Sequence, residues 1–123
     1  MPSREYQKAL KQLRSICAAL PEFKEVVAWG HPTFRAGKKM FAAFGEGVEG
    51  QKGLSLGVKV GFDRQEELLK DPRFYPTPYA AHQGWVSLPI DGTTDWAEVK
   101  GLLHEAYRQV ALQRMLKALN DRT

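Results

Sequence analysis

The spacing of apolar residues at the start of the chain predicts an amphipathic helix over residues 4–20. Apolar side chains recur there every three or four positions, while basic side chains occupy the opposite side. Because an α-helix turns once every 3.6 residues, this spacing forms one stripe that can face a core. The stripe consists of Tyr6, Leu10, Leu13, Cys17 and Leu20. Pro21 ends the predicted helix, since it lacks the N–H group that a helix interior needs.

The pattern then changes to one that is typical of strands. Adjacent valines favour a strand over residues 24–29. Residues 33–35 and 38–44 predict a hairpin with Gly37 at its turn. Over residues 54–60 apolar residues alternate with small or polar ones, which is the period of a strand with one buried face.

Glycine and proline interrupt this region twice. Gly30 and Pro32 flank His31, so we expect the chain there not to continue as a regular central strand. Residues 45–53 contain four glycines and predict a loop at the tip of a hairpin.

The second half of the chain predicts a short helix, an irregular loop over residues 73–84, a strand over residues 85–90 and a long helix. Asp63 and Asp95 each precede a glutamate by three residues, a spacing that resembles a capping box at the start of a helix. The long helix has an apolar stripe at helical spacing. Its members are Trp96, Val99, Leu103, Ala106, Tyr107 and Val110.

The apolar stripe shifts after residue 111. Arg114 falls where an apolar residue is due, and the apolar residues lie roughly opposite: Leu112, Met115, Leu116 and Leu119. The helix therefore bends near residue 112, or its end packs against the first helix or another subunit. We expect one domain over residues 1–123, of the α+β class, with an antiparallel sheet and helices packed on one face.

The composition is that of a soluble globule, with 43% hydrophobic and 26% charged residues. No apolar run approaches the length of about 20 residues that spans a bilayer, and the N-terminus lacks the apolar region of a signal peptide. The single cysteine, Cys17, cannot form an internal disulfide and suits a reducing compartment. We therefore expect a cytoplasmic protein that has no contact with a membrane.

The net charge of +4 is concentrated in the first third of the chain. Residues 1–45 carry eight basic and three acidic side chains, whereas residues 46–123 carry ten basic and eleven acidic ones. This asymmetry favours an anionic partner, nucleic acid above all, unless the charge only keeps the domain soluble. The candidate phosphate-contacting residues surround the predicted hairpin and loop: Arg35, Lys38, Lys39, Lys52 and Lys59.

Two aromatic segments predict a pocket. The first runs from Trp29 to Arg35 and the second from Pro78 to Val86. Side chains from both could meet over the sheet, although aromatic residues at strand ends also serve ordinary core packing. The candidate pocket residues are Trp29, His31, Phe34, Tyr79, His82 and Trp85.

No motif for catalysis, a metal or a cofactor is present. His31, His82 and His104 lack the spacing of a metal site, and residues 45–53 are not followed by the Gly-Lys-Ser/Thr of a phosphate-binding loop. Cys17 lies on the apolar stripe of the first helix, which indicates a buried thiol rather than a nucleophile.

The chain resembles the MmcQ/YjbR family of small bacterial proteins. The resemblance is carried by residues 29–35, by Lys39, Phe41 and Ala42, by Pro78-Tyr79 and Gly84-Trp85-Val86, and by Asp91-Gly92 with the stripe of the long helix. It implies a frataxin-like (CyaY-like) fold in a double-wing arrangement, and a DNA-binding role described for the family by analogy of fold. Iron binding of the frataxin type would need acidic residues on the first helix, which is basic here.

Three functions remain open. The first is a non-enzymatic domain that binds nucleic acid through the basic residues around the hairpin. The second is a pocket for a small molecule or peptide, lined by His31, His82 and Trp85. The third is an interaction module that forms a homodimer through the apolar end of the last helix.

Overall fold

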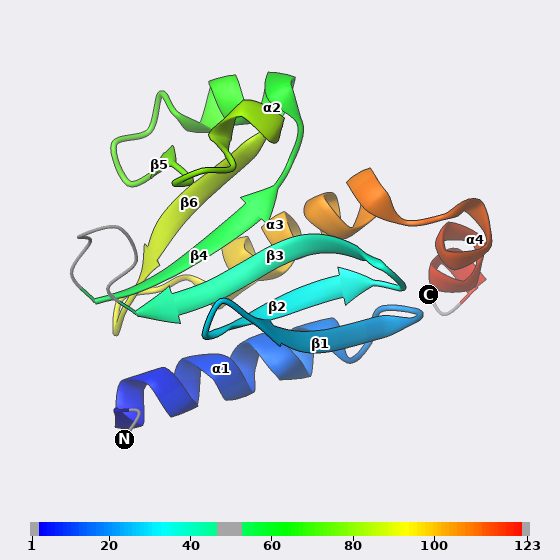
Figure 1. Ribbon diagram of the computed structural model, residues 1–123, viewed down its shortest axis with the longest axis horizontal. Helices are drawn as coiled ribbons and strands as arrows, with labels where there is room; N and C mark the ends of the chain where they lie inside the picture. The colour runs from blue at the N-terminus through cyan, green and yellow to red at the C-terminus, as the bar shows by residue number, and fades with distance from the viewer. Residues whose placement is uncertain (1–2, 47–52, 122–123) are drawn as a thin grey trace.

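The computed structural model describes residues 3–46 and 53–121 and has the α+β architecture that the sequence predicts (Figure 1). Six antiparallel strands form one sheet in the order β1-β2-β3-β4-β6-β5. Within the described residues, four α-helices and one short 3₁₀ helix accompany them. The first four strands form a meander, as the short connections between them predict.

Helix α1 spans Arg4–Cys17, three residues less than predicted. The Ser3 hydroxyl accepts the backbone N–H of Tyr6 at 3.1 Å and opens the helix. After Cys17 the backbone makes tight turns, with Leu20 N donating to Cys17 O at 2.9 Å. Leu20 therefore reaches the core from a turn rather than from the helix.

Strands β1 (Phe23–Ala28) and β2 (His31–Ala36) form a tight hairpin around Trp29 and Gly30. Both turn residues have positive φ, 52° and 78°, as the two-residue hairpin turns that match strand twist require. Our expectation of an irregular chain at His31 was therefore wrong. Pairing with β3 begins only at Thr33. Pro32 has no N–H to donate, but at this position the pairing with β3 requires none.

Strands β3 (Lys39–Glu46) and β4 (Leu54–Lys59) lie at the centre of the sheet. The prediction that β4 has one exposed face was wrong, because Leu54 to Val58 are all buried. Helix α3 covers one face of this strand, and the chain between α2 and β6 covers the other.

Helix α2 spans Phe62–Leu68 and begins after Gly61, so Asp63 is not its N-cap as predicted. The predicted loop that follows contains strand β5 (Tyr75–Pro76) and the 3₁₀ helix η2 (Ala81–Gln83), before strand β6 (Trp85–Ile90). The Gln65 side-chain amide donates to the carbonyl oxygens of Ala81 and Trp85, at 2.8 and 2.7 Å. These two bonds fix the segment relative to α2.

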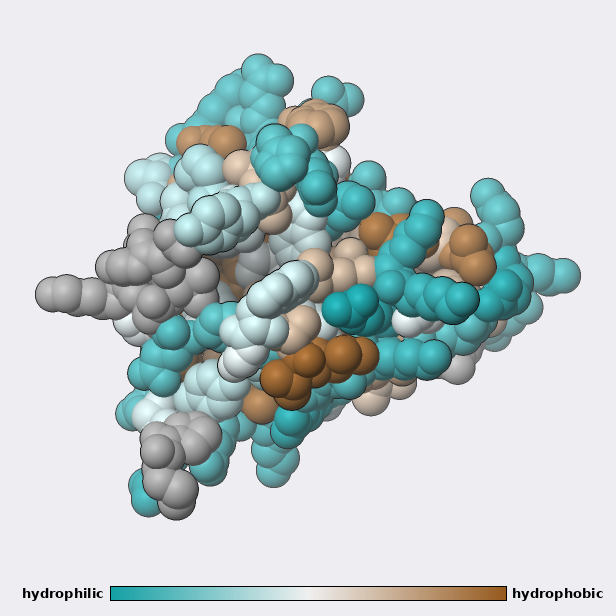
Figure 2. Space-filling view, in the orientation of Figure 1, coloured by the Kyte–Doolittle hydropathy of each residue, from teal (hydrophilic) through white to brown (hydrophobic). Residues whose placement is uncertain are grey.

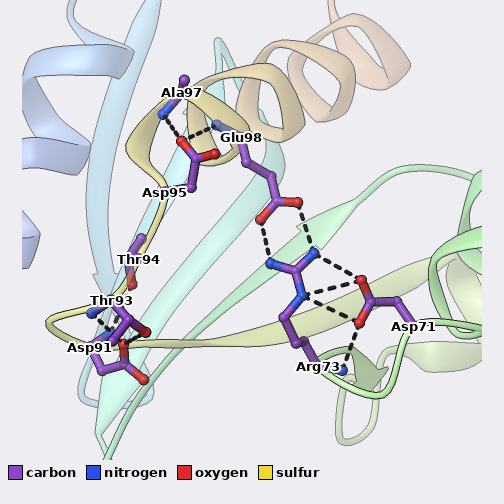
Figure 3. A network of polar contacts seen from close by, with 8 residues as sticks. All are labelled: Asp71, Arg73, Asp91, Thr93, Thr94, Asp95, Ala97 and Glu98. Carbon is purple, nitrogen blue, oxygen red and sulfur yellow. Dashed lines mark hydrogen bonds and ion pairs between the residues drawn. The ribbon is translucent and has the colours of Figure 1, made fainter.

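Helix α3 spans Trp96–Val110 and begins at Asp95, as predicted. The Asp95 carboxylate accepts the backbone N–H groups of Ala97 and Glu98 (Figure 3). Glu98 does not complete a capping box, because its carboxylate accepts two hydrogen bonds from the guanidinium of Arg73. The predicted apolar stripe is buried apart from Trp96, which is partly buried.

The shift of the stripe after residue 111 marks a break between two helices. Ala111 has an extended backbone, with ψ 143°, and a separate helix α4 spans Gln113–Asp121. Met115 and Leu119 on α4 are buried against the same protomer. Arg114 instead points to the surface and pairs with Glu22 at 2.9 Å.

The two longest helices pack on one face of the sheet, as predicted. Side chains of α1 and α3 join the strand residues of that face in one apolar core. Tyr6 of α1 lies 5.1 Å from the Phe44 ring, and Tyr107 of α3 makes an edge contact with Phe41 at 5.7 Å. In the described part of the chain, the opposite face carries no long helix and is partly covered by the chain from α2 to β6 (Figure 1).

Candidate functional site

The open face of the sheet is lined by unusually small side chains. The strand register brings Thr33, Ala43, Gly57, Ser87 and Tyr75 into one row that crosses five strands. Residues at alternate positions of a strand face opposite sides, so the neighbours of this row point into the core. The three middle residues of the row are alanine, glycine and serine, and these small side chains leave room above the sheet. The Thr77 side chain packs over Gly57, where an added Cβ would lie 3.4 Å from it, and Ala43 is the more exposed of the three.

A cavity of about 650 Å³ occupies this hollow. Its walls come from three places: the β1–β2 hairpin, the open face of the central strands, and the segment from Tyr75 to Trp85. Figure 2 shows the depression between the hairpin and the part of the molecule formed by β5 and η2. A volume of this size suits a small organic molecule.

The polar groups of the cavity wall include the hydroxyls of Thr33, Thr77 and Ser87. The hydroxyls of Thr77 and Ser87 lie 2.8 Å apart and share one hydrogen bond, so the pair keeps one further donor and free lone pairs. Thr33 is buried and donates from Oγ1 to the carbonyl oxygen of Val26 at 2.5 Å. No described residue that lines the cavity is Asp, Glu, Lys or Arg.

Two aromatic side chains at the cavity are almost fully exposed. Trp29 in the β1–β2 turn is 83% exposed, and Tyr79 between β5 and η2 is 86% exposed. Both have left-handed backbone conformations, with φ of 52° and 63°. A large side chain in such a conformation is strained, and such strain is concentrated at functional sites.

The structure brings together four of the six predicted pocket residues, because Trp29, His31, Tyr79 and Trp85 all line the cavity. Phe34 does not, and this part of the prediction was wrong. It is fully buried on the core face, where its ring stacks on Phe23 at 5.8 Å. His82 is exposed on η2 and is not part of the lining, whereas its neighbour Gln83 is.

Sequence reasoning missed the floor of the cavity, which consists of Ala43, Ser55, Gly57 and Ser87. In the sequence they are indicated by the small residues Ser55 and Gly57, which alternate with large apolar ones along residues 54–58. We interpreted the small positions of residues 54–60 as a solvent-exposed face, because the sequence does not show that a second layer covers them.

The predicted basic residues gather at one end of the sheet. Arg35 and Lys39 lie near the β2–β3 turn, and the register places Lys59 opposite the start of β3. Lys38 and Lys39 are exposed, while Arg35 and Lys59 are half-buried. Arg35 donates from Nε to Thr33 Oγ1 at 3.3 Å, which places it beside the cavity. Lys52 lies outside the described residues.

None of these four basic residues forms an ion pair with a described carboxylate. The ion pairs of the described residues use other arginines, namely Arg14, Arg64, Arg73 and Arg114. Positive charge at this end of the sheet is therefore not neutralised within residues 3–46 and 53–121.

Two further titratable groups lie away from the cavity. Burial raises the pKa of the Cys17 thiol to about 12, in keeping with the inert thiol predicted from its place on the stripe. Burial, with Lys100 and Arg108 nearby, lowers the pKa of His104, whose Nε2 has no hydrogen-bond partner among the described residues. In the described ranges, no three His, Cys, Asp or Glu side chains are grouped to hold a metal ion. Over the same ranges no helix has the length and apolarity that crossing a bilayer demands.

The last helix leaves little apolar surface for the predicted homodimer. Met115 and Leu119 are used within the protomer, and Leu112, which is 45% exposed, is the large apolar residue of this region that remains free. Dimerisation through α4 stays a prediction, with Leu112 as the residue that would have to carry it.

Comparisons with known proteins agree with the architecture. A family model described as YjbR matches residues 18–109. A crystal structure of a Deinococcus radiodurans protein with a DUF419 domain is similar with a TM-score of 0.69 and 26% identity, covering 90% of this chain and 87% of that chain. A Pseudomonas syringae protein structure is similar with a TM-score of 0.67 and 16% identity, covering 88% and 98%. No curated protein matches the sequence.

These comparisons support the family resemblance and the fold. The frataxin-like double-wing arrangement, DNA binding and the cytoplasmic location stay predictions.

Proposed function

The chain belongs to the YjbR family, and from this premise we propose that it is a non-enzymatic binding domain whose cavity holds a small organic molecule or a short peptide. The observation that carries the proposal is the row of small side chains across the open face, with a cavity of about 650 Å³ above it. A sheet face that serves only stability is normally filled by larger side chains, because voids lose packing contacts.

The arrangement of polar groups favours binding over catalysis. The hydroxyl pair Thr77 and Ser87 has no histidine or carboxylate bonded to it in the described part of the chain. An activated nucleophile needs such a base within hydrogen-bond reach. Fixed hydroxyls on a mostly apolar wall are instead typical of sites that orient a ligand.

The proposal is tested by blocking the cavity. Ala43 lies on the floor and is only partly buried, so Ala43→Leu adds its side chain to the hollow rather than to the core. We would titrate adenosine, indole, glucose and trialanine into the ¹⁵N-labelled protein and follow the amide signals of Thr33, Gly57 and Ser87. We expect at least one probe to shift these signals, and the Ala43→Leu variant to lose the response.

Ala97→Leu is the matched control, because Ala97 is exposed in the first turn of α3, away from the cavity. This variant should bind as the unaltered protein does. The proposal is overturned if no probe shifts the cavity signals, or if Ala43→Leu binds as well as Ala97→Leu.

Nucleic acid binding is the second candidate, because a specific observation favours it. Arg35, Lys38, Lys39 and Lys59 gather at one end of the sheet without carboxylate partners among the described residues. Basic side chains without carboxylate partners at the end of a sheet can contact phosphates, although such contacts carry no information about base sequence.

The second candidate is tested by salt dependence. We would measure binding of single- and double-stranded DNA and RNA at about 50 and about 200 mM salt. If about four phosphates are contacted in a duplex, the affinity falls roughly a hundredfold over this range. Lys38→Glu combined with Lys39→Glu should weaken binding further, and equal affinity of this variant and the unaltered protein would exclude the basic end as the interface.

A further inference from the structure

Resting on the proposed function, we infer that the cavity takes an uncharged, planar heteroaromatic ring, held by stacking on Trp29 and Tyr79. The two side chains reach the cavity from different parts of the chain, Trp29 from the β1–β2 turn and Tyr79 from the segment before η2. Aromatic faces exposed at a cavity bind flat rings, because stacking gains area without requiring a particular pattern of hydrogen bonds.

Backbone strain is the first argument for this role. Only three described residues other than glycine have positive φ, and Trp29 and Tyr79 are two of them. Asparagine or glycine would adopt these conformations at lower cost. Neither aromatic ring recovers that cost by packing, since both are more than four-fifths exposed. A residue that is strained, exposed and large at the same time contributes little to the stability of the free protein, so its role is to contact something else.

The polarity of the lining defines the class of ring. The described lining contains no carboxylate, ammonium or guanidinium group, so a formal charge placed deep in the cavity would lose its water without gaining an ion pair. The hydroxyl pair of Thr77 and Ser87 offers both a donor and acceptors. Together these groups match an uncharged ring that carries nitrogen and oxygen atoms at its edge, as a nucleobase does.

Such a ring could belong to a free molecule or to a longer strand. The basic end of the sheet borders the cavity, because Arg35 is bonded to Thr33 in the cavity wall. A phosphate attached to a bound ring could therefore lie near Arg35 and Lys59 without entering the uncharged part of the site. A free nucleoside and a base of a single strand share the ring chemistry, and the experiment separates them.

The test measures binding and stability in the same variants. We would titrate adenosine, cytidine, guanosine, thymidine and indole, and separately a single-stranded oligodeoxyadenylate, into the unaltered protein and into Trp29→Asn and Tyr79→Asn. Ring binding should weaken roughly ten- to a hundredfold in each variant, which is the effect of losing one stacking partner. The midpoint of thermal unfolding should rise or stay unchanged, because asparagine relieves the strain.

The conservative variants Trp29→Phe and Tyr79→Phe keep an aromatic face and should retain most of the affinity. A much higher affinity for the oligonucleotide than for the nucleosides would show that the site holds a base within a strand. Equal affinities would show that it holds a free ring. The inference is overturned if the asparagine variants bind the rings as the unaltered protein does, or if only glucose or trialanine occupies the cavity. The latter result leaves the proposed binding function intact. If no probe binds to the unaltered protein, both this inference and the proposed function are overturned.

Discussion

The hydroxyl of Tyr107 donates a hydrogen bond to the carbonyl oxygen of Pro21 at 2.7 Å, in the buried interior. The bond joins the last turn of α3 to the turn that leads from α1 into β1. These two segments lie far apart in the sequence, so the contact fixes the position of α3 relative to the turn that follows α1.

Replacing Tyr107 by phenylalanine should destabilise the fold. The ring can keep its edge contact with Phe41, but a buried carbonyl loses a hydrogen-bond donor, which costs about 1–2 kcal/mol. Urea unfolding should show a lower midpoint with an unchanged slope. Tyr79→Phe is the matched control, because the Tyr79 side chain is exposed and its hydroxyl has no such bond to a described residue. Equal midpoints for the two variants would contradict this account.

Gly37 should tolerate alanine poorly because two effects act at this position. Its φ of 60° strains any residue with a Cβ atom, at a cost of about 1 kcal/mol. A Cβ there would also come within 2.9 Å of the terminal methyl of Met115 on α4. Gly30→Ala separates the effects, since its φ is 78° and a Cβ there meets nothing within 4 Å. The Met115 methyl is the far end of a flexible side chain and can shift at small cost, so urea unfolding should show only a slightly larger loss for Gly37→Ala than for Gly30→Ala. A larger loss for Gly30→Ala would contradict the contact with α4.

The elements that periodicity defines were predicted well from the sequence. The stripes of α1 and α3 and the alternation in β4 depend on residues close in sequence, so they identify the core face without knowledge of the fold. The break at Ala111 was foreseen only as a change in the stripe. A change of stripe fits a bend as well as a break, and the extended backbone at Ala111, with ψ 143°, distinguishes them.

The cavity was predicted in part, and the wrong assignment of Phe34 to its lining has a simple cause. His31 and Phe34 are three positions apart in one strand, so the period of two places them on opposite faces. The prediction that both line one pocket is incompatible with that strand. The interruption that Gly30 and Pro32 predict at His31 hides this alternation in the sequence.

The segment from Tyr75 to Trp85, which covers the cavity, is held by contacts that no local pattern reveals. The bonds from Gln65 to the backbone of Ala81 and Trp85 join residues 16 and 20 positions apart. The left-handed conformations of Trp29 and Tyr79 also escaped prediction, because aromatic residues rarely adopt them.

Arg73 should control the ionisation of Asp71, which lies with it in the chain between α2 and β5. Its guanidinium bonds both Asp71 and Glu98 (Figure 3), and the bonds from Arg73 hold the pKa of Asp71 below its usual value. A lowered folded-state pKa means that the pair stabilises the fold above the ordinary pKa of about 3.9 and loses this effect as pH falls through the lowered value. In Arg73→Gln, the Asp71 pKa measured by NMR should rise toward its ordinary value.

Asp91 provides the internal control for that titration. Its pKa is also lowered, but the cause is hydrogen bonding from the side chain and backbone of Thr93, with no arginine involved. The Asp91 pKa should therefore stay low in Arg73→Gln. A rise of both values would show that the substitution disturbs the fold rather than one ion pair.

The predicted homodimer needs a point substitution as its test. Deleting residues 112–123 would remove the buried side chains of Met115 and Leu119 and expose the core. Leu112→Glu changes only an exposed apolar side chain. If α4 forms a dimer, sedimentation equilibrium should give twice the chain mass for the unaltered protein and a lower mass for Leu112→Glu. An identical mass for both would remove α4 as an interface.

Cys17 should be unreactive in the folded protein. Its side chain is fully buried on α1, and burial raises the pKa of the thiol to about 12, so at about pH 8 almost none of it is the reactive thiolate. We expect a disulfide reagent such as DTNB to react at least roughly a hundredfold more slowly with the folded chain than with the chain in concentrated guanidinium chloride. Tyr107→Phe should speed the reaction of the folded chain, because loss of the bond between α3 and the turn after α1 makes opening of α1 more frequent. Rapid labelling of the unaltered folded protein would show that α1 opens readily and that its apolar stripe contributes less to the core than its burial indicates.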